Sequence, residues 1–272
     1  MQRFGSIGLG HNHSCMLTAA GAAWCWGDNE YGQLGATAGE TCVEGAERPC
    51  STQPLAVAGG LAFKTLSAGT RHSCSLTSEG AAWCWGFGLG GQLGDGQRAN
   101  SQLPREVGGG HVFDALSVSL WGGLSCGVEA DGSVWCWGPG FGYGTTGPAP
   151  SELPARWNEA SAVTFTQIAL GEAHACGLDA VGGAWCIGNN GYGQLGDGGT
   201  ASSKVPLAVS GGRRYVEIVA GPSHSCALAA DGQAWCWGFG NAIGDGLGDA
   251  APPRREPVAV AGGQRFVHLT AG

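Results

Sequence analysis

The sequence predicts an all-β fold, namely a β-propeller built from four-stranded blades. Three observations lead to this prediction: a unit that recurs about every 50 residues, short strand-like segments separated by glycine turns, and no convincing helical periodicity. The repeat first appears as Gly10–Gly35, with the sequence GHNHSCMLTAAGAAWCWGDNEYGQLG. Self-similarity at this period is typical of propellers and solenoids, in which neighbouring repeats stack into one body.

The core of the repeat returns four times along the chain. It reads HSCSLTSEGAAWCWG from His72, SCGVEADGSVWCWG from Ser125, HACGLDAVGGAWCIG from His174 and HSCALAADGQAWCWG from His224. We therefore expect a single propeller domain over residues 1–272. Its five full repeats fall at approximately residues 4–62, 63–112, 113–164, 165–214 and 215–265, and residues 266–272 match the opening strand of a sixth.

Each repeat can be divided into four strands, as the fifth repeat illustrates. Tyr215–Gly221 alternates in hydrophobicity, His224–Leu228 is a second strand, Ala229–Gly232 is a turn and Gln233–Gly238 is a third strand. The turn has a glycine where a positive φ is needed. A glycine-rich corner then leads to a short fourth strand, Pro257–Val260. Four-stranded sheets repeated in this way are the blades of a propeller.

The consensus AGxxHSCxLTxxGxxWCWGxNxxGQLGDG, followed by PxxV and an aromatic-led strand, closely resembles the regulator of chromosome condensation repeat. The resemblance covers nearly the whole chain. It implies a β-propeller, commonly of seven blades in that family, and seven blades of this size would need roughly 350 residues. We therefore interpret the chain as a truncated or partial ring. The resemblance also implies an alternative activity, guanine-nucleotide exchange on a small GTPase.

The repeats depart from the consensus mainly in their loops. The first contains an insertion, Ala36–Pro54. The third has Leu124 in place of the histidine, an additional Trp121, and altered connections at Gly138–Gly147 and Pro148–Trp157. Because binding residues lie on loops more often than on scaffold strands, we expect a binding face in these two repeats. Its candidate residues are Glu40, Glu44, Arg48, Phe141, Tyr143 and Trp157.

The twelve cysteines form five pairs within the repeats and one pair in the insertion. Within a repeat, the two cysteines lie on adjacent antiparallel strands, which brings their Cα atoms within the roughly 4.4–6.8 Å of a disulfide. Disulfides are our main interpretation. The candidates are Cys15, Cys25, Cys42, Cys50, Cys74, Cys84, Cys126, Cys136, Cys176, Cys186, Cys226 and Cys236. Zinc sites and free buried thiols are the alternatives, but zinc prefers four ligands at tighter spacing and the third repeat lacks the histidine.

Other recurring residues are interpreted as structural. We expect the repeated histidines to hydrogen-bond neighbouring loops, and the tryptophans, which alternate on one strand face, to pack between blades. These residues are His13, His72, His174, His224, Trp24, Trp83, Trp135, Trp185 and Trp235. Asp95, Asp197 and Asp245 each lie in a Gly-Asp-Gly turn, where a single carboxylate is too few for a calcium site.

Composition argues against several functional classes. A net charge of −8 without a basic stripe argues against nucleic acid, and no apolar run is long enough to span a membrane. No catalytic or nucleotide-binding motif is present, so we expect no enzyme activity, cofactor or metal. Paired cysteines indicate an extracellular or periplasmic location, although the N-terminus lacks an apolar signal core; free thiols would instead indicate the cytoplasm.

We therefore expect a non-catalytic scaffold that binds a protein partner through its blade loops. Guanine-nucleotide exchange is the alternative function. A thiol redox enzyme is a weaker alternative, because it would need one strained or exposed cysteine pair rather than five equivalent ones. Self-association is expected if the ring is incomplete.

Overall fold

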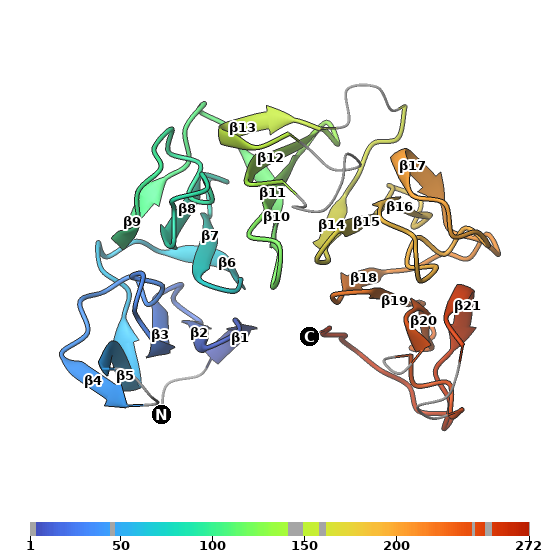
Figure 1. Cartoon of the computed structure of the whole chain (residues 1–272), viewed down its shortest axis with the longest axis horizontal. Coiled ribbons are helices and arrows are strands. Elements are labelled where there is room, and N and C mark those ends of the chain that lie inside the picture. The colour runs from blue at the N-terminus through green and yellow to red at the C-terminus, as the bar shows by residue number, and fades with distance from the viewer. Residues whose placement is uncertain are drawn as a thin grey trace. The chain divides into compact units, whose positions relative to one another are not determined.

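The computed structural model describes residues 4–43, 47–140, 149–157, 162–240, 243–247 and 252–271. Within these ranges the chain contains 21 strands and no α-helix. The strands form five antiparallel sheets, one for each predicted repeat (Figure 1). The all-β class and the division into five repeats are confirmed.

The first sheet has five strands rather than the predicted four. Its order is β1-β2-β3-β5-β4, and its strands are β1 (Phe4–Leu9), β2 (His13–Thr18), β3 (Ala23–Asp28), β4 (Glu40–Val43) and β5 (Glu47–Ala56). The additional strand comes from the insertion. Since β5 is ten residues long, its second half pairs with β3 while its first half pairs with β4, and Cys50 lies opposite both Asp28 and Glu40.

The other four sheets have four strands each, in sequence order. Their strands are β6 (Phe63–Ala68), β7 (His72–Thr77), β8 (Ala82–Gly86) and β9 (Ser101–Glu106); β10 (Phe113–Val118), β11 (Ser125–Glu129), β12 (Val134–Gly138) and β13 (Ser151–Arg156); β14 (Gln167–Leu170), β15 (His174–Leu178), β16 (Ala184–Gly188) and β17 (Ser203–Ala208); β18 (Glu217–Ala220), β19 (His224–Leu228), β20 (Ala234–Gly238) and β21 (Arg254–Ala259). In the fifth repeat the second strand has the predicted bounds. The fourth begins earlier than predicted, because Gly238 at the end of β20 pairs with Arg254.

The prediction of a sixth opening strand at residues 266–272 is wrong for its described part. The segment starts as the earlier repeats do, since Phe266 N donates to Gly232 O at 2.8 Å just as Phe63 N donates to Gly21 O. Leu269 N also donates to Glu217 Oε2 at 3.1 Å. However, residues 266–271 belong to no sheet, because no strand among the described residues pairs with them.

The chain divides into two compact units. The first contains the described residues of Met1–Ala130, Trp135–Gly140 and Ala149–Arg156, and the second those of Asp131–Val134 and Trp157–Gly272. Within the first unit, β6 contacts β1 and β2, and β10 contacts β6 and β7. Within the second, β18 contacts β14 and β15. A single domain over the whole chain stays a prediction.

Tryptophans fill the core between neighbouring sheets of each unit. The second tryptophan of the WCW motif is fully buried in three repeats, as Trp85, Trp137 and Trp237. Trp85, for example, belongs to one apolar cluster with Leu17, Leu34 and Phe63. The first tryptophan of each motif is only partly buried; these residues are Trp24, Trp83, Trp135, Trp185 and Trp235. The tryptophan strand therefore has one fully buried position and one nearer the surface.

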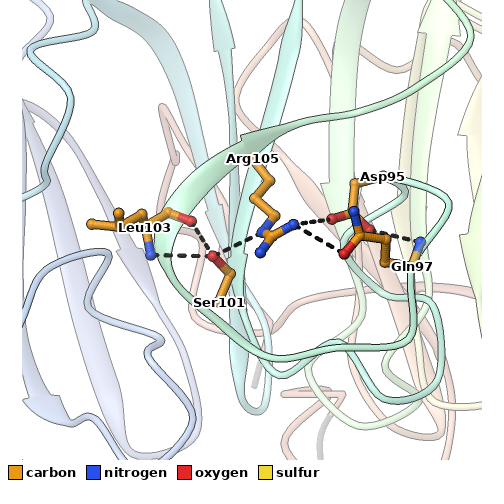
Figure 2. A network of polar contacts seen from close by, with 5 residues as sticks. All are labelled: Asp95, Gln97, Ser101, Leu103 and Arg105. Carbon is orange, nitrogen blue, oxygen red and sulfur yellow. Dashed lines mark hydrogen bonds and ion pairs between the residues drawn. The ribbon is translucent and has the colours of Figure 1, made fainter.

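A polar network braces the corner between β8 and β9 (Figure 2). Arg105 donates to Asp95 Oδ2 and to Gln97 Oε1, both at 3.2 Å, and to Ser101 Oγ at 3.1 Å. The Asp95 side chain closes the turn by accepting from Gln97 N at 3.0 Å. The equivalent aspartates of the fourth and fifth repeats accept from the residue two positions later in the same way; they are Asp197 and Asp245. The predicted turn-forming role of these aspartates is confirmed.

Candidate functional site

Three loops of the first compact unit meet at one end of its sheets. The first residue of the second strand pairs with the last residue of the third, as His72 pairs with Gly86. The loop before the second strand and the loop after the third therefore lie at the same end of the sheet. His11 N donates to Gly69 O at 3.3 Å, and Thr70 Oγ1 donates to Leu120 O. The loops before β2, β7 and β11 are therefore in successive contact.

Buried histidines fix these loops to the scaffold. Nε2 of His13 lies 2.8 Å from Ser73 Oγ, and Nε2 of His72 lies 2.9 Å from Ser125 Oγ. Each serine hydroxyl in turn donates to a glutamine carbonyl, as Ser73 does to Gln33 O at 3.2 Å. The hydroxyl proton is therefore engaged, so the serine accepts from an Nε2–H of a neutral imidazole.

Burial keeps these imidazoles uncharged. Desolvation lowers the pKa of His13 to about 4, and it lowers the pKa of His72 and of His174 to about 3. In the second unit, Nε2 of His174 lies 2.9 Å from Ser225 Oγ, which repeats the same contact. Burial also lowers the pKa of His224. His13, His72 and His174 thus link successive repeats, and the lowered pKa of all four histidines gives them no acid–base role at neutral pH.

A glycine lets the third strand approach these loops closely. Gly86 has a φ of +105°, and a Cβ at this position would lie 2.5 Å from Arg71 O. The following amide, Phe87 N, donates to Arg71 O at 2.8 Å. Only glycine meets both requirements without strain, so the backbone around Arg71 is set by the scaffold.

Aromatic side chains and one arginine surround the place where the loops meet. The Arg71 guanidinium lies 5.2 Å from the centre of the Tyr31 ring, and the Tyr31 and Phe87 rings meet edge to face at 5.1 Å. The His11 and Trp121 rings make a second edge contact at 5.1 Å. Trp121 is 47% exposed. We call this surface the aromatic–arginine face; it consists of His11, Tyr31, Arg71, Phe87 and Trp121.

The insertion of the first repeat lies beside this face. Asn29 N, two residues before Tyr31 in the loop, donates to Pro49 O at 2.8 Å, and Arg48 forms an ion pair with Glu30 at 3.0 Å. Glu40 instead accepts from Thr52 N and Oγ1, and these bonds lower the pKa of its carboxyl group. Of the predicted binding residues, Arg48 is therefore next to the face, while Glu40 holds the hairpin together.

The remaining predicted binding residues lie elsewhere. Glu44, Phe141 and Tyr143 are outside the described residues. Trp157 belongs to the second compact unit, where it lines a cavity of about 40 Å³ together with Phe165, Trp185, Ile187 and others. The structure does not bring Trp157 together with Glu40 or Arg48 in one unit.

The second unit contains a partial copy of the face. Tyr192 and Phe239 meet edge to face at 5.1 Å, as Tyr31 and Phe87 do. Ser223, however, stands in the repeat position of Arg71. This copy has the aromatic pair without the cation, which makes it a natural control for the first unit.

Sequence reasoning missed four of the residues that form the face. His11, Tyr31, Arg71 and Phe87 were not singled out, and Trp121 was noted only as an addition to the third repeat. The sequence does contain a signal for two of these residues, because the two positions before the repeated histidine vary more between repeats than the histidine itself. A comparison of these variable positions across repeats would have found His11 and Arg71.

All twelve cysteines are paired at disulfide distance. The five pairs within the repeats lie directly opposite each other, with Cα atoms 4.1 Å apart, and Cys42 and Cys50 are 5.7 Å apart. The predicted pairing is thus the one found. Among the described residues, no group of three or more histidine, cysteine or acidic side chains is placed to hold a metal ion. Nor do these residues contain a helix long and apolar enough to cross a membrane.

Comparison with known proteins identifies the repeat. The regulator of chromosome condensation (RCC1) repeat matches residues 6–33, 63–92, 165–194 and 215–242 in one form, and residues 20–76, 79–120 and 182–228 in a second form that covers more than half of the chain. The third repeat, which has lost its histidine and its GQLG corner, is matched least completely.

Similar proteins include much longer chains. The probable E3 ubiquitin-protein ligase HERC4 of Homo sapiens is 40% identical over 88 residues, which are 32% of this chain and 8% of that protein. The ultraviolet-B receptor UVR8 of Arabidopsis thaliana is 33% identical over 98 residues, or 36% of this chain and 21% of the receptor. The chain thus matches only a small part of each of these relatives.

Solved structures share the fold over the whole chain. Human WBSCR16 has a TM-score of 0.82 at 22% identity, and covers 100% of this chain with 70% of its own. Prp20p from Saccharomyces cerevisiae has a TM-score of 0.79 at 20% identity, and covers 100% of this chain with 67% of its own. At these identities the likeness establishes the β-propeller fold.

Proposed function

The chain belongs to the regulator of chromosome condensation (RCC1) repeat family, and on that premise we propose that it is a non-catalytic protein-interaction scaffold whose partner binds the aromatic–arginine face. The observation that carries this proposal is a set of ring and guanidinium contacts among loop residues. His11, Arg71 and Trp121 lie on the three loops in contact, and Tyr31 and Phe87 lie on the loops that follow β3 and β8. Trp, Tyr and Arg are the side chains most enriched among residues that dominate binding energy.

The loops that carry the face are held in place by the scaffold, which favours binding. Buried His13 and His72 and the tight backbone contact at Gly86 hold the loops on a rigid sheet scaffold. Binding therefore requires little ordering of the backbone, and that ordering is one of the main free-energy costs of association. The fold likeness supports a protein partner, because the structure of Prp20p is described together with its binding to Gsp1p and histones.

Binding of proteins from an extract of the source cells tests this proposal. Trp121→Ala and Tyr31→Ala should each lose a specifically bound protein, because Trp121 is an exposed ring of the face and Tyr31 contacts both Arg71 and Phe87. Tyr192→Ala is the matched control, since Tyr192 occupies the same loop position in the second unit. Equal loss with all three variants, or no loss with the first two, would rule out this face as the binding site.

Nucleotide exchange on a small GTPase stays an alternative prediction. The likeness to Prp20p is at 20% identity and concerns the fold alone. If the recovered partner is a small GTPase, release of a fluorescent guanine nucleotide with and without the chain measures the activity. Acceleration that is lost in Trp121→Ala would replace the scaffold proposal with the exchange alternative.

We also propose that the protein works in an oxidising compartment. The six cysteine pairs at disulfide distance support this proposal, because such bonds persist outside the reducing cytosol. Intact mass after alkylation under denaturing conditions tests it in protein isolated from its source. No label before reduction and twelve labels after it are expected, whereas twelve labels without reduction would place the protein in the cytoplasm.

A further inference from the structure

Arg71 differs in its charge environment from three other arginines of the first compact unit, and it shares with Arg156 the absence of a carboxylate partner among the described residues. Arg48, Arg98 and Arg105 each form an ion pair with a carboxylate of the same unit. Arg71 lies over the Tyr31 ring, and no carboxylate is within ion-pair distance of it in the part of the chain that the structure describes. Arg71 is thus an exposed cation without a carboxylate partner among the described residues, in a chain of net charge −8.

The fold itself does not require a cation at this position. The other repeats have Asn12, Gly123, Ala173 and Ser223 at the equivalent place before the second strand. The second unit has the same aromatic pair with Ser223 instead of an arginine, and its rings keep the same 5.1 Å separation. Arg71 is therefore a specific feature of the second repeat.

The contacts of Arg71 prepare it to bind an anion. Its backbone is held by the bond from Phe87 N, and its guanidinium lies near a ring face, which restricts the side chain. The planar N–H groups of an arginine can bind a carboxylate in bidentate fashion. Trp121, which is 47% exposed, supplies apolar surface on the same face.

From these observations we infer that the partner presents a carboxylate to Arg71, flanked by an apolar side chain that packs on the exposed rings. This inference rests on the proposed function, since it names the chemistry of the partner at the same face. An acidic protein segment fits better than a phosphorylated one, because phosphate recognition generally uses clusters of arginines and the face has only Arg71. A phosphorylated partner is an outcome that the test can detect.

Selection from a random peptide library displayed on phage tests this inference with the oxidised chain as bait. Selection on the wild-type chain and counter-selection on Arg71→Gln should enrich peptides with Asp or Glu next to an aromatic or aliphatic residue. A synthetic peptide of the enriched sequence should bind about tenfold or more weakly to Arg71→Gln. Replacing its acidic residue with the amide should weaken binding similarly, and the two changes together should cost little more than either alone.

Two controls separate the possible results. Tyr192→Ala should bind the peptide like the wild type, and Arg71→Gln should show the same disulfides and urea midpoint as the wild type. Peptides that need Trp121 but contain no acidic residue, or that bind Arg71→Gln equally well, would overturn the inference while leaving the proposed face intact. Tenfold or tighter binding of a phosphoserine version than of the acidic peptide would also overturn it. If no enriched peptide depends on Trp121 or Tyr31, the proposed face itself is wrong.

Discussion

Acidification should destabilise this fold through its buried histidines before its carboxylates are protonated. The ordinary pKa of an unfolded histidine is 6.5, whereas burial lowers the pKa of His13 to about 4 and that of His72 and His174 to about 3. The unfolded chain therefore binds more protons than the folded chain below about pH 6.5. Stability is complete above this pH and is lost as the pH falls toward the folded values.

The size of the effect follows from these pKa values. Each histidine contributes a loss of about 1.4 kcal/mol for each pH unit below 6.5, or about 2 kcal/mol at pH 5. At pH 5 the order-of-magnitude loss is about 4 kcal/mol for the first compact unit, which holds His13 and His72, and about 2 kcal/mol for the second, which holds His174. Native domains have stabilities of only about 5–15 kcal/mol, so the loss in the first unit is large enough to bring that unit close to unfolding.

Urea unfolding of the oxidised protein, followed by tryptophan fluorescence between about pH 7 and pH 5, measures this loss. The double variant His72→Leu/Ser125→Ala introduces the residue types that the third and fourth repeats carry at these positions, Leu124 and Ala175. Replacing both residues removes one titrating group, and it leaves no buried hydroxyl group without its hydrogen-bond partner. The variant should lose about 2 kcal/mol less between these two pH values than the wild type.

Two results would refute this reasoning. Unfolding free energies that do not change between pH 7 and pH 5 would mean that the buried histidines do not control acid stability. An unchanged pH slope in the double variant would mean that His72 makes no contribution. The two compact units require separate fits if they unfold in separate transitions.

Three smaller perturbations test the scaffold, each by its urea unfolding free energy. Trp85→Phe removes a buried N–H that donates to a carbonyl of the preceding repeat at 2.9 Å, and it should cost about 1–3 kcal/mol. Gly86→Ala should cost about 1–3 kcal/mol, because the site has a φ of +105° and a Cβ would meet Arg71 O. Arg105→Gln should cost less than about 1 kcal/mol, since that arginine is 39% exposed. Equal costs for all three would contradict this account of the repeat.

The repeat made most of the fold predictable from sequence. Five copies of one pattern fix the strand–turn–strand register, so the opposition of Cys15 and Cys25 follows from the turn between them. The fifth strand of the first sheet was not predicted, because an insertion carries no repeat register that would show how it pairs. Residues 266–271 match a strand in sequence, but a strand also requires a partner to pair with.

The candidate site was predicted less well than the fold. The long insertion and altered corners drew attention to Glu40 and Trp157, yet Glu40 bonds within its own hairpin and Trp157 lines a cavity in the other unit. The aromatic–arginine face consists of single residues in loops of ordinary length. Its contacts join residues as far apart as His11 and Trp121, and only the stacking of successive repeats brings these together.

The most direct test of the central claim is site-specific photocrosslinking from the aromatic–arginine face and from its partial copy in the second unit. A benzophenone amino acid at position 121 reports on the aromatic–arginine face, and the same group at position 192 reports on the copy that lacks the arginine. We expect irradiation with the partner present to give a covalent adduct from position 121 and none from position 192. An adduct from position 192 alone, or equal adducts from both positions, would contradict a binding site at the first face.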